Sequence, residues 1–232
     1  MARRSAKPTG DAAPGGESLS TPEPSGSLKV TFTELAKGTR LHRVHQSKYK
    51  ADQFNPGNQG NARFSPIQDG QGRAIPTLYA GTTLPCALME TVFHDVPHTV
   101  GFKSIDKAKL EGQVHSEVVV AAPVKLVDLS SVPLRKLGVT RKQLIDTEKD
   151  QYAGTRKWAV AFHGQCPDAQ GLTWVSRQDD SARAVMLFGD RIPEGMLKPE
   201  GASRSLIGDA GTYDGVLDLA DRIGAVIVPG KS

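Results

Sequence analysis

Short apolar segments of two different periods alternate along the chain from residue 28 onward, and this alternation most restricts the folds that are possible. Val114–Ala121 alternates like a strand, whereas Tyr152–Phe162 fits a helix that carries Trp158. Polar turns rich in glycine, proline and asparagine separate such segments. Strands and helices mixed in this way predict a single α+β domain, and nothing in their order demands a parallel, doubly wound sheet.

The pattern also places the individual elements. Thr83 is typical of a residue that caps a helix N-terminus, and Pro85 suits the first turn after it. A loop rich in glycine and asparagine is expected over residues 52–62. Strands are expected at 39–44, 75–80, 114–121, 125–129, 172–176, 184–188 and 225–228, and helices at 84–93, 140–149, 152–162 and 213–223.

The first 27 residues differ in composition from the rest of the chain. They are rich in Gly, Pro, Ser, Thr and Ala, they hold almost no large apolar residue, and their basic and acidic residues balance. Such a segment cannot bury enough apolar surface to offset the entropy that ordering costs. We therefore expect a flexible leader at 1–27, whose removal leaves activity intact, and a folded domain at 28–232.

Composition and charge exclude several classes of protein. The two cysteines, Cys86 and Cys166, lack the spacing of a metal site, and the apolar runs are too short to span a bilayer. No secretory signal follows the first residues. The net charge of +4 is not gathered into a basic stripe with aromatic residues. We expect a cytoplasmic protein with reduced thiols that binds neither membranes nor nucleic acid directly.

Glu90 is the first candidate for chemistry. A helix over 84–93 would carry apolar side chains on most of its circumference, so it should be largely buried. A carboxylate there is costly unless it is paired with a cation or used in a reaction. The helical pattern by itself favours an ion pair or a half-exposed position, and it leaves a catalytic role open.

Four more polar residues could bind a ligand, although each has a commoner structural role. Arg43 lies within an expected strand, and Arg63 ends the Gly/Asn loop, where a guanidinium could grip a phosphate. Ser176 ends a strand and could orient a ribose or simply begin a turn. Tyr79 could face a ligand or the core.

A metal site is not expected. His94 and His98 are spaced four residues apart, but Pro97 argues against a continuous helix there and no H-E-x-x-H motif is present.

The order of these residues is more informative than any one of them. Read along the chain, the sequence is similar to the RES family, which is named after an arginine, a glutamate and a serine. The resemblance covers about Thr39–Gly189. It departs from the family at His42, where an aromatic residue is frequent, and at Asn61-Ala62, where a glycine pair is frequent. The matching segments are Leu41-His42-Arg43-Val44, Ala62-Arg63-Phe64-Ser65-Pro66, Thr77-Leu78-Tyr79-Ala80, Ala87-Leu88-Met89-Glu90, Lys125-Leu126-Val127-Asp128-Leu129, and Trp174-Val175-Ser176-Arg177 followed by Met186-Leu187-Phe188.

The resemblance implies a fold related to ADP-ribosyltransferases and a toxin that consumes NAD as substrate, with no cofactor or metal. It also implies a cognate antitoxin of the Xre type and an oligomeric complex. In this reading Glu90 stabilises the positive charge that develops on the ribose, and Ser176 orients the ribose or holds Glu90. Arg43 and Arg63 would grip the pyrophosphate or a ribose, and Tyr79 would pack against the nicotinamide or a ribose.

Two other functions stay open beside an NADase that uses water or phosphate as acceptor. A protein ADP-ribosyltransferase would use the same fold with a protein side chain as acceptor. A catalytically inert module would serve only to bind its antitoxin.

Overall fold

A computed structural model describes residues 20–230 and confirms the mixed α+β class. Within this part of the chain, an eight-stranded sheet runs in the order β1-β8-β9-β10-β5-β2-β7-β11. The pairing of β8 with β9 is parallel and the others are antiparallel. In that order, the strands are Phe32–Leu35, Val124–Asp128, Gly171–Val175, Arg183–Phe188, Thr77–Gly81, Arg40–Gln46, Gln113–Val120 and Leu197–Ser205.

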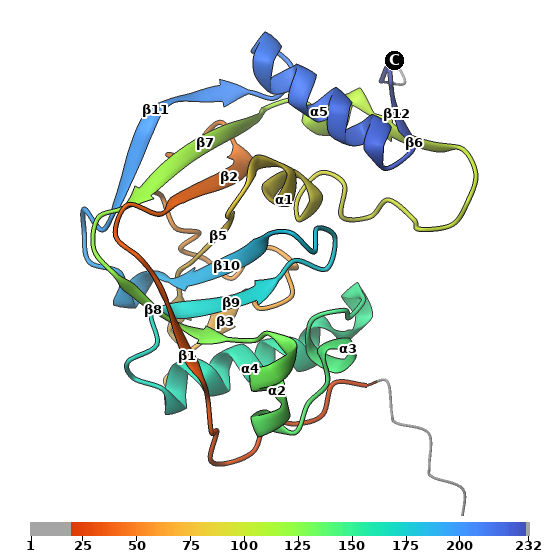
Figure 1. Ribbon diagram of the computed structural model, residues 1–232. Coiled ribbons are helices and arrows are strands. Elements are labelled where there is room, and N and C mark those ends of the chain that lie inside the picture. Colours follow the sequence, from red (N-terminus) through yellow and green to blue (C-terminus); the bar gives the residue numbers. More distant parts are fainter. Residues whose placement is uncertain (1–19, 231–232) are drawn as a thin grey trace, which may run out of the picture.

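Helices group at two places on this curled sheet (Figure 1). Near β8 and β9 lie α2 (Ser131–Leu137), α3 (Arg141–Leu144) and α4 (Tyr152–Gln165), and near β2 and β7 lie α1 (Leu84–Met89) and α5 (Ala210–Arg222). The chain also forms a parallel pair of β6 (Lys103–Asp106) with β12 (Ala225–Val228) and a small hairpin of β3 (Ile67–Gln68) with β4 (Ala74–Ile75). Three short 3₁₀ turns are η1 (Lys107–Leu110), η2 (Lys149–Gln151) and η3 (Gly189–Arg191).

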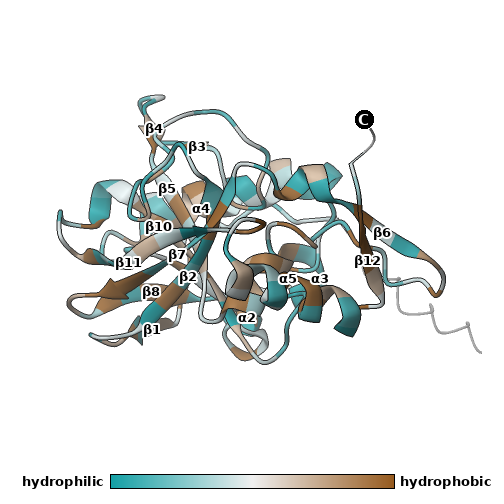
Figure 2. Ribbon diagram, turned by 90° about the horizontal axis from the view of Figure 1, so that it is seen from above, coloured by the Kyte–Doolittle hydropathy of each residue, from teal (hydrophilic) through white to brown (hydrophobic). Residues whose placement is uncertain are grey.

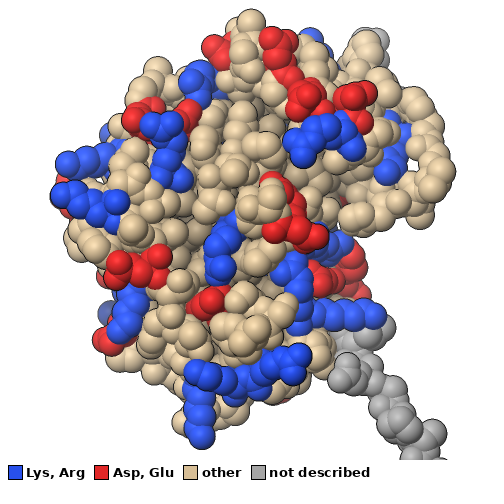
Figure 3. Space-filling model, viewed as in Figure 1, with Lys and Arg blue, Asp and Glu red and all other residues tan. Residues whose placement is uncertain are grey.

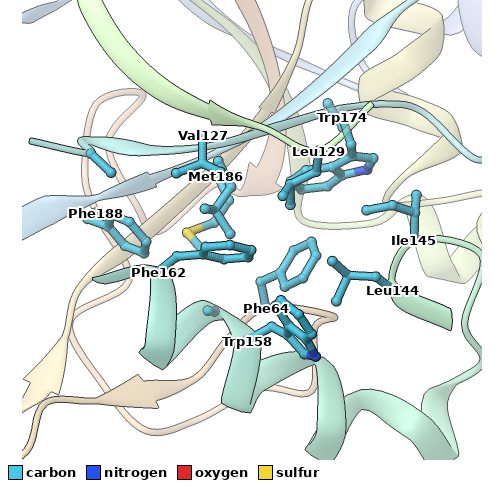
Figure 4. Close-up of a cluster of buried hydrophobic side chains, with 14 of the residues drawn as sticks. Phe64, Val127, Leu129, Leu144, Ile145, Trp158, Phe162, Trp174, Met186 and Phe188 are labelled. Atoms are coloured by element: carbon cyan, nitrogen blue, oxygen red, sulfur yellow. The ribbon is translucent and has the colours of Figure 1, made fainter. Parts of the chain in front are cut away.

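Apolar side chains pack the helices against the sheet and against one another. The largest cluster joins α4 to the sheet, and it includes the fully buried Trp158, Phe162 and Trp174 (Figure 4). A second cluster packs α1 and α5 together through residues such as Leu88 and Val216. Apolar and polar residues alternate along the helices and strands (Figure 2), as expected for elements with one buried face. None of the helices among the described residues has the length and apolar character that crossing a membrane requires.

The structure confirms the strands expected around residues 40, 77, 114, 125, 172, 184 and 225, but two expected helices are shorter than predicted. The helix that begins after Thr83 ends at Met89, because the N–H groups of Thr91, Val92 and Phe93 all bond to the carbonyl of Leu88. The helix expected at 140–149 is the single turn α3, which Thr140 caps with Gln143, and a separate turn η2 follows.

The last part of the predicted flexible leader contacts the folded domain. Residues 1–19 lie outside the described residues, whereas residues 20–27 lie along α4. There the Trp158 Nε1 atom donates to the carbonyl of Pro22 at 2.7 Å, and Gln165 Nε2 donates to the carbonyl of Ser25 at 3.1 Å. Thr21 packs against Gly154 and its hydroxyl donates to the Gln143 carbonyl at 2.7 Å. Composition does not reveal these contacts because backbone carbonyls make most of them.

Candidate active site

A cavity of about 340 Å³ opens where α1, the start of α4 and the loop before Phe64 meet the sheet. Four of the five residues singled out from the sequence meet here, three in its lining and Ser176 directly behind Glu90. The lining consists of Val44, Asn61, Ala62, Arg63, Tyr79, Ala80, Ala87, Glu90, Thr91, His94, Lys149, Tyr152, Trp174 and Ala184.

Glu90 is the C-cap residue of α1 and lines the cavity. The hydroxyl of Ser176, which is fully buried at the end of β9, donates to Glu90 Oε1 at 2.7 Å. The same hydroxyl oxygen accepts the N–H groups of Gln178 and Asp179. Ser176 thus begins a turn and also hydrogen-bonds to the Glu90 carboxylate. Charge-assisted hydrogen bonds of this kind are stronger than neutral ones.

Arg63 lies on the other side of the Glu90 carboxylate. Its Nη1 atom is 4.0 Å from Glu90 Oε2, and its guanidinium lies 5.7 Å from the centre of the Tyr152 ring. Thr155 of α4 donates its hydroxyl to the backbone carbonyl of Arg63 and so fixes the end of the loop. The residue is only 6% exposed, and its Nε atom is buried without a hydrogen-bond partner among the described residues.

Two aromatic residues form an apolar wall of the cavity. Tyr79 on β5 accepts the N–H of Phe64 at its Oη atom, at 3.0 Å, and its ring meets Trp174 edge-on. Burial raises the pKa of Tyr79 to about 12, so the phenol stays neutral at physiological pH. The wall can therefore pack against a flat ring without adding charge.

Arg43 does not reach this cavity. Successive residues of a strand point to opposite faces, and its neighbour Val44 lines the cavity. The Arg43 Nη1 atom instead donates to the carbonyls of Lys50 and Ala51, at 3.1 and 2.9 Å, and so holds the turn after β2. Burial lowers the pKa of Arg43 to about 10, which still leaves it charged at neutral pH.

The cavity offers a carboxylate and no reactive thiol. The nearby Cys86 is buried in α1, and burial together with the Glu90 and Asp179 charges raises its pKa to about 12. The Cys86 thiol is therefore protonated at neutral pH and is a poor nucleophile. A carboxylate that Ser176 holds in place beside an aromatic wall is suited to stabilising a positive charge on a bound ligand.

The sequence profile of the RES domain matches residues 40–209, which include all five of the residues discussed above. The chain belongs to the RES family. No curated protein matches it. Among solved structures, one that resembles this RES protein is a chain from the "M.tuberculosis MbcT-MbcA toxin-antitoxin complex", at 13% identity and a TM-score of 0.55. The similarity covers 78% of this chain and 90% of that chain, and it supports the fold.

Sequence reasoning missed several residues that line the RES cavity. His94 comes shortly after the end of α1, and Lys149 and Tyr152 follow 55 or more residues further along the chain. Lys149 and Tyr152 lie at the junction of η2 and α4, and the expected helices over 140–149 and 152–162 gave no reason to single out that junction. His94 was considered only as a metal ligand. The sequence signal that could have pointed to Lys149 is a basic residue just before an expected helix.

The RES domain also has a cluster of possible metal ligands outside this cavity. Among the described residues, His42, His115 and Glu117 place one ligand atom each within 4.8 Å of the others. These atoms already have partners. Arg204 donates to Glu117 and, at 3.3 Å, to His115 Nδ1, Arg40 lies 3.3 Å from Glu117, and His42 Nδ1 lies 3.0 Å from His115 Nε2. The cluster therefore forms a hydrogen-bonded network on the sheet.

Proposed function

We propose that this RES protein is a toxin-type enzyme that consumes NAD by cleaving the bond between nicotinamide and ribose. The observation that carries the proposal is the Glu90 carboxylate, which Ser176 holds at 2.7 Å and Arg63 flanks at 4.0 Å at the edge of an aromatic-walled cavity. Family membership makes this chemistry the one to test first.

The reaction needs little more than a fixed negative charge. When the C–N bond breaks, its electron pair leaves with nicotinamide, which becomes neutral and needs no acid. The ribose then carries oxocarbenium-like positive charge, which a nearby carboxylate stabilises as in glycoside hydrolysis. Water as acceptor gives ADP-ribose and releases a proton, and phosphate gives the corresponding sugar phosphate. The step requires no cofactor.

The other residues position the substrate in this proposal. Ser176 keeps Glu90 in place and Tyr79 packs against the nicotinamide or its ribose, while Arg63 contacts a phosphate or a ribose hydroxyl. For Arg43 we propose a supporting role, because its bonds to the carbonyls of Lys50 and Ala51 hold a turn and use its guanidinium.

The proposed setting is the cytoplasm, in an oligomeric complex with an antitoxin. The solved structure that resembles this chain is itself a toxin–antitoxin complex, which supports an antitoxin partner. We propose a partner of the Xre type, as the family resemblance implies.

The experiment is to measure intracellular NAD after controlled expression of the wild type and of Glu90→Gln, with Glu194→Gln as a control. Glu194 is exposed and outside the cavity lining, so its loss of charge should not matter. We expect NAD to fall with the wild type and with Glu194→Gln but not with Glu90→Gln. Stable NAD with all three soluble proteins would contradict the proposal. Label transferred from NAD to protein would then indicate an ADP-ribosyltransferase, and unimpaired growth an inert module.

A further inference from the structure

The charges that line the cavity do not cancel. Arg63 and Glu90 are within 4.0 Å of each other, so each offsets the other. Lys149 is the second cation of the lining, and no second carboxylate accompanies it there. Burial lowers the pKa of the remaining basic group, His94, so it adds no charge at neutral pH. Among the described lining residues one positive charge is thus in excess, that of Lys149, whose ion-pair partner Asp95 lies outside the lining.

Lys149 lies at the start of a helical segment, between Glu148 and Asp150. It begins η2, which leads directly into α4, a helix whose N-terminus has no side-chain cap. The aligned peptide dipoles of a helix give its N-terminus partial positive charge, which favours anions there and disfavours cations. A lysine at this place, facing a cavity, is suited to an anion that arrives from outside.

In the structure Asp95 takes the place of such an anion. The Lys149 Nζ atom lies 2.8 Å from Asp95 Oδ2, and the side chains are 49% and 60% exposed. Ion pairs that exposed contribute little stability, so the lysine can change partners at small cost. Asp95 also keeps a second contact, at 3.0 Å to His94 Nδ1, when Lys149 leaves it.

Arg63 is a second donor in the same cavity lining. Arg63 lies against the ring of Tyr152, three residues after Lys149, and its buried Nε atom has no partner among the described residues. A buried donor without a partner is costly, and an oxyanion in the cavity could satisfy it. Figure 3 shows acidic and basic side chains mixed over the face it presents.

We propose that Lys149 binds a phosphoryl group of the substrate at the edge of the cavity, exchanging Asp95 for it, with Arg63 as the second donor. This inference rests on the proposed function and adds an orientation to it. The diphosphate lies toward Lys149, and the cationic nicotinamide riboside lies toward Glu90. The same chemistry would also suit free phosphate as acceptor.

The test is calorimetric titration of ADP-ribose, and separately of inorganic phosphate, into the full chain and its variants. Lys149→Gln keeps the length of the side chain and removes its charge. Lys125→Gln is the matched control, because Lys125 forms a similarly exposed pair with Asp168 at 2.9 Å and does not line the cavity. One lost charge-assisted hydrogen bond corresponds to an affinity loss on the order of tenfold.

We expect Lys149→Gln to weaken ADP-ribose binding by that factor, and Asp95→Asn to strengthen it because the competing carboxylate is gone. A Lys149 effect on phosphate alone would also support the oxyanion site and assign it to the acceptor. Affinities of Lys149→Gln that match those of Lys125→Gln for both ligands would overturn the inference.

Failure of this inference can be told apart from failure of the proposed function. If the wild type consumes NAD and Lys149→Gln binds both ligands unchanged, only the inference is wrong. If the wild type consumes no NAD but binds phosphate in a Lys149-dependent way, the oxyanion site stands and the proposed reaction is wrong. If the wild type binds neither ligand, the site is overturned as well.

Discussion

Replacing Ser176 with alanine tests how the candidate site holds its carboxylate. The substitution removes the 2.7 Å hydrogen bond to Glu90 Oε1 and the acceptor for the N–H groups of Gln178 and Asp179. Because Arg63 remains only at 4.0 Å, the Glu90 carboxylate loses its closest partner. Its charge stays, but its position becomes less well defined.

The expected size of the effect follows from these contacts. A hydrogen bond to a charged group contributes about 1.5–3 kcal/mol, which corresponds to a roughly 10- to 150-fold loss in kcat/KM if all of it acts in the transition state. The two lost backbone contacts should also lower the Tm by a few degrees, at ~2–4 °C per kcal/mol for a chain of this size.

The assay is steady-state cleavage of NAD by the wild type, Ser176→Ala, Glu90→Gln and the double variant. If Ser176 acts through Glu90, the double variant should be about as slow as Glu90→Gln alone, since the carboxylate it positions is already gone. Ser181→Ala is the control, because this exposed hydroxyl belongs to the same turn and bonds only to Asp179 in the structure. Losses that multiply in the double variant would refute this reasoning.

Three further predictions concern stability. Deleting residues 1–27 should lower the Tm by several degrees more than deleting 1–19, because the contacts of Thr21, Pro22 and Ser25 with the domain are lost only in the longer deletion. Differential scanning calorimetry compares the two variants. Gly171→Ala should destabilise the fold by about 1–3 kcal/mol, because a Cβ there would lie 2.3 Å from the Met186 carbonyl oxygen. An unchanged midpoint in urea titrations would contradict this close approach of β10 to Gly171. Burial, followed by the charges of His42 and Arg204, lowers the pKa of His115 to about 4. The contribution of His115 to stability should therefore be full above about pH 6.5 and be lost as the pH falls toward 4. Urea titrations across that range should give a flatter pH profile for His115→Gln than for the wild type.

Local signals in the sequence predicted the elements that have strong local causes. Thr83 caps α1 as expected, and the alternation in Val114–Ala121 marks β7. The strand β11 was not expected, because Leu197–Ser205 is largely exposed and contains Pro199 and Gly201. Its strand conformation comes from pairing with β7, which is a tertiary interaction that no local pattern encodes.

The candidate site was predictable to a similar extent. The segment order that matches the RES family pointed to Glu90, Ser176, Arg63 and Tyr79, which the fold brings together. The face of β2 to which Arg43 points was not predictable, because a partly buried strand has polar residues on both faces. The place of Lys149 in the site was also not predictable, since it depends on a cavity that exists only in the folded chain.

The two end strands of the sheet bear on how this protein avoids edge-to-edge aggregation. An unpaired strand edge can serve as a template for another chain, and natural sheets guard against this with prolines, charges and irregular pairing. The end strand β11 carries Lys198, Pro199 and Glu200, and its register shifts between Glu200 and Arg204. At the opposite end β1 is only four residues long. Both ends of the sheet are therefore poor starting points for fibre growth, and neither favours the addition of a strand from another protein.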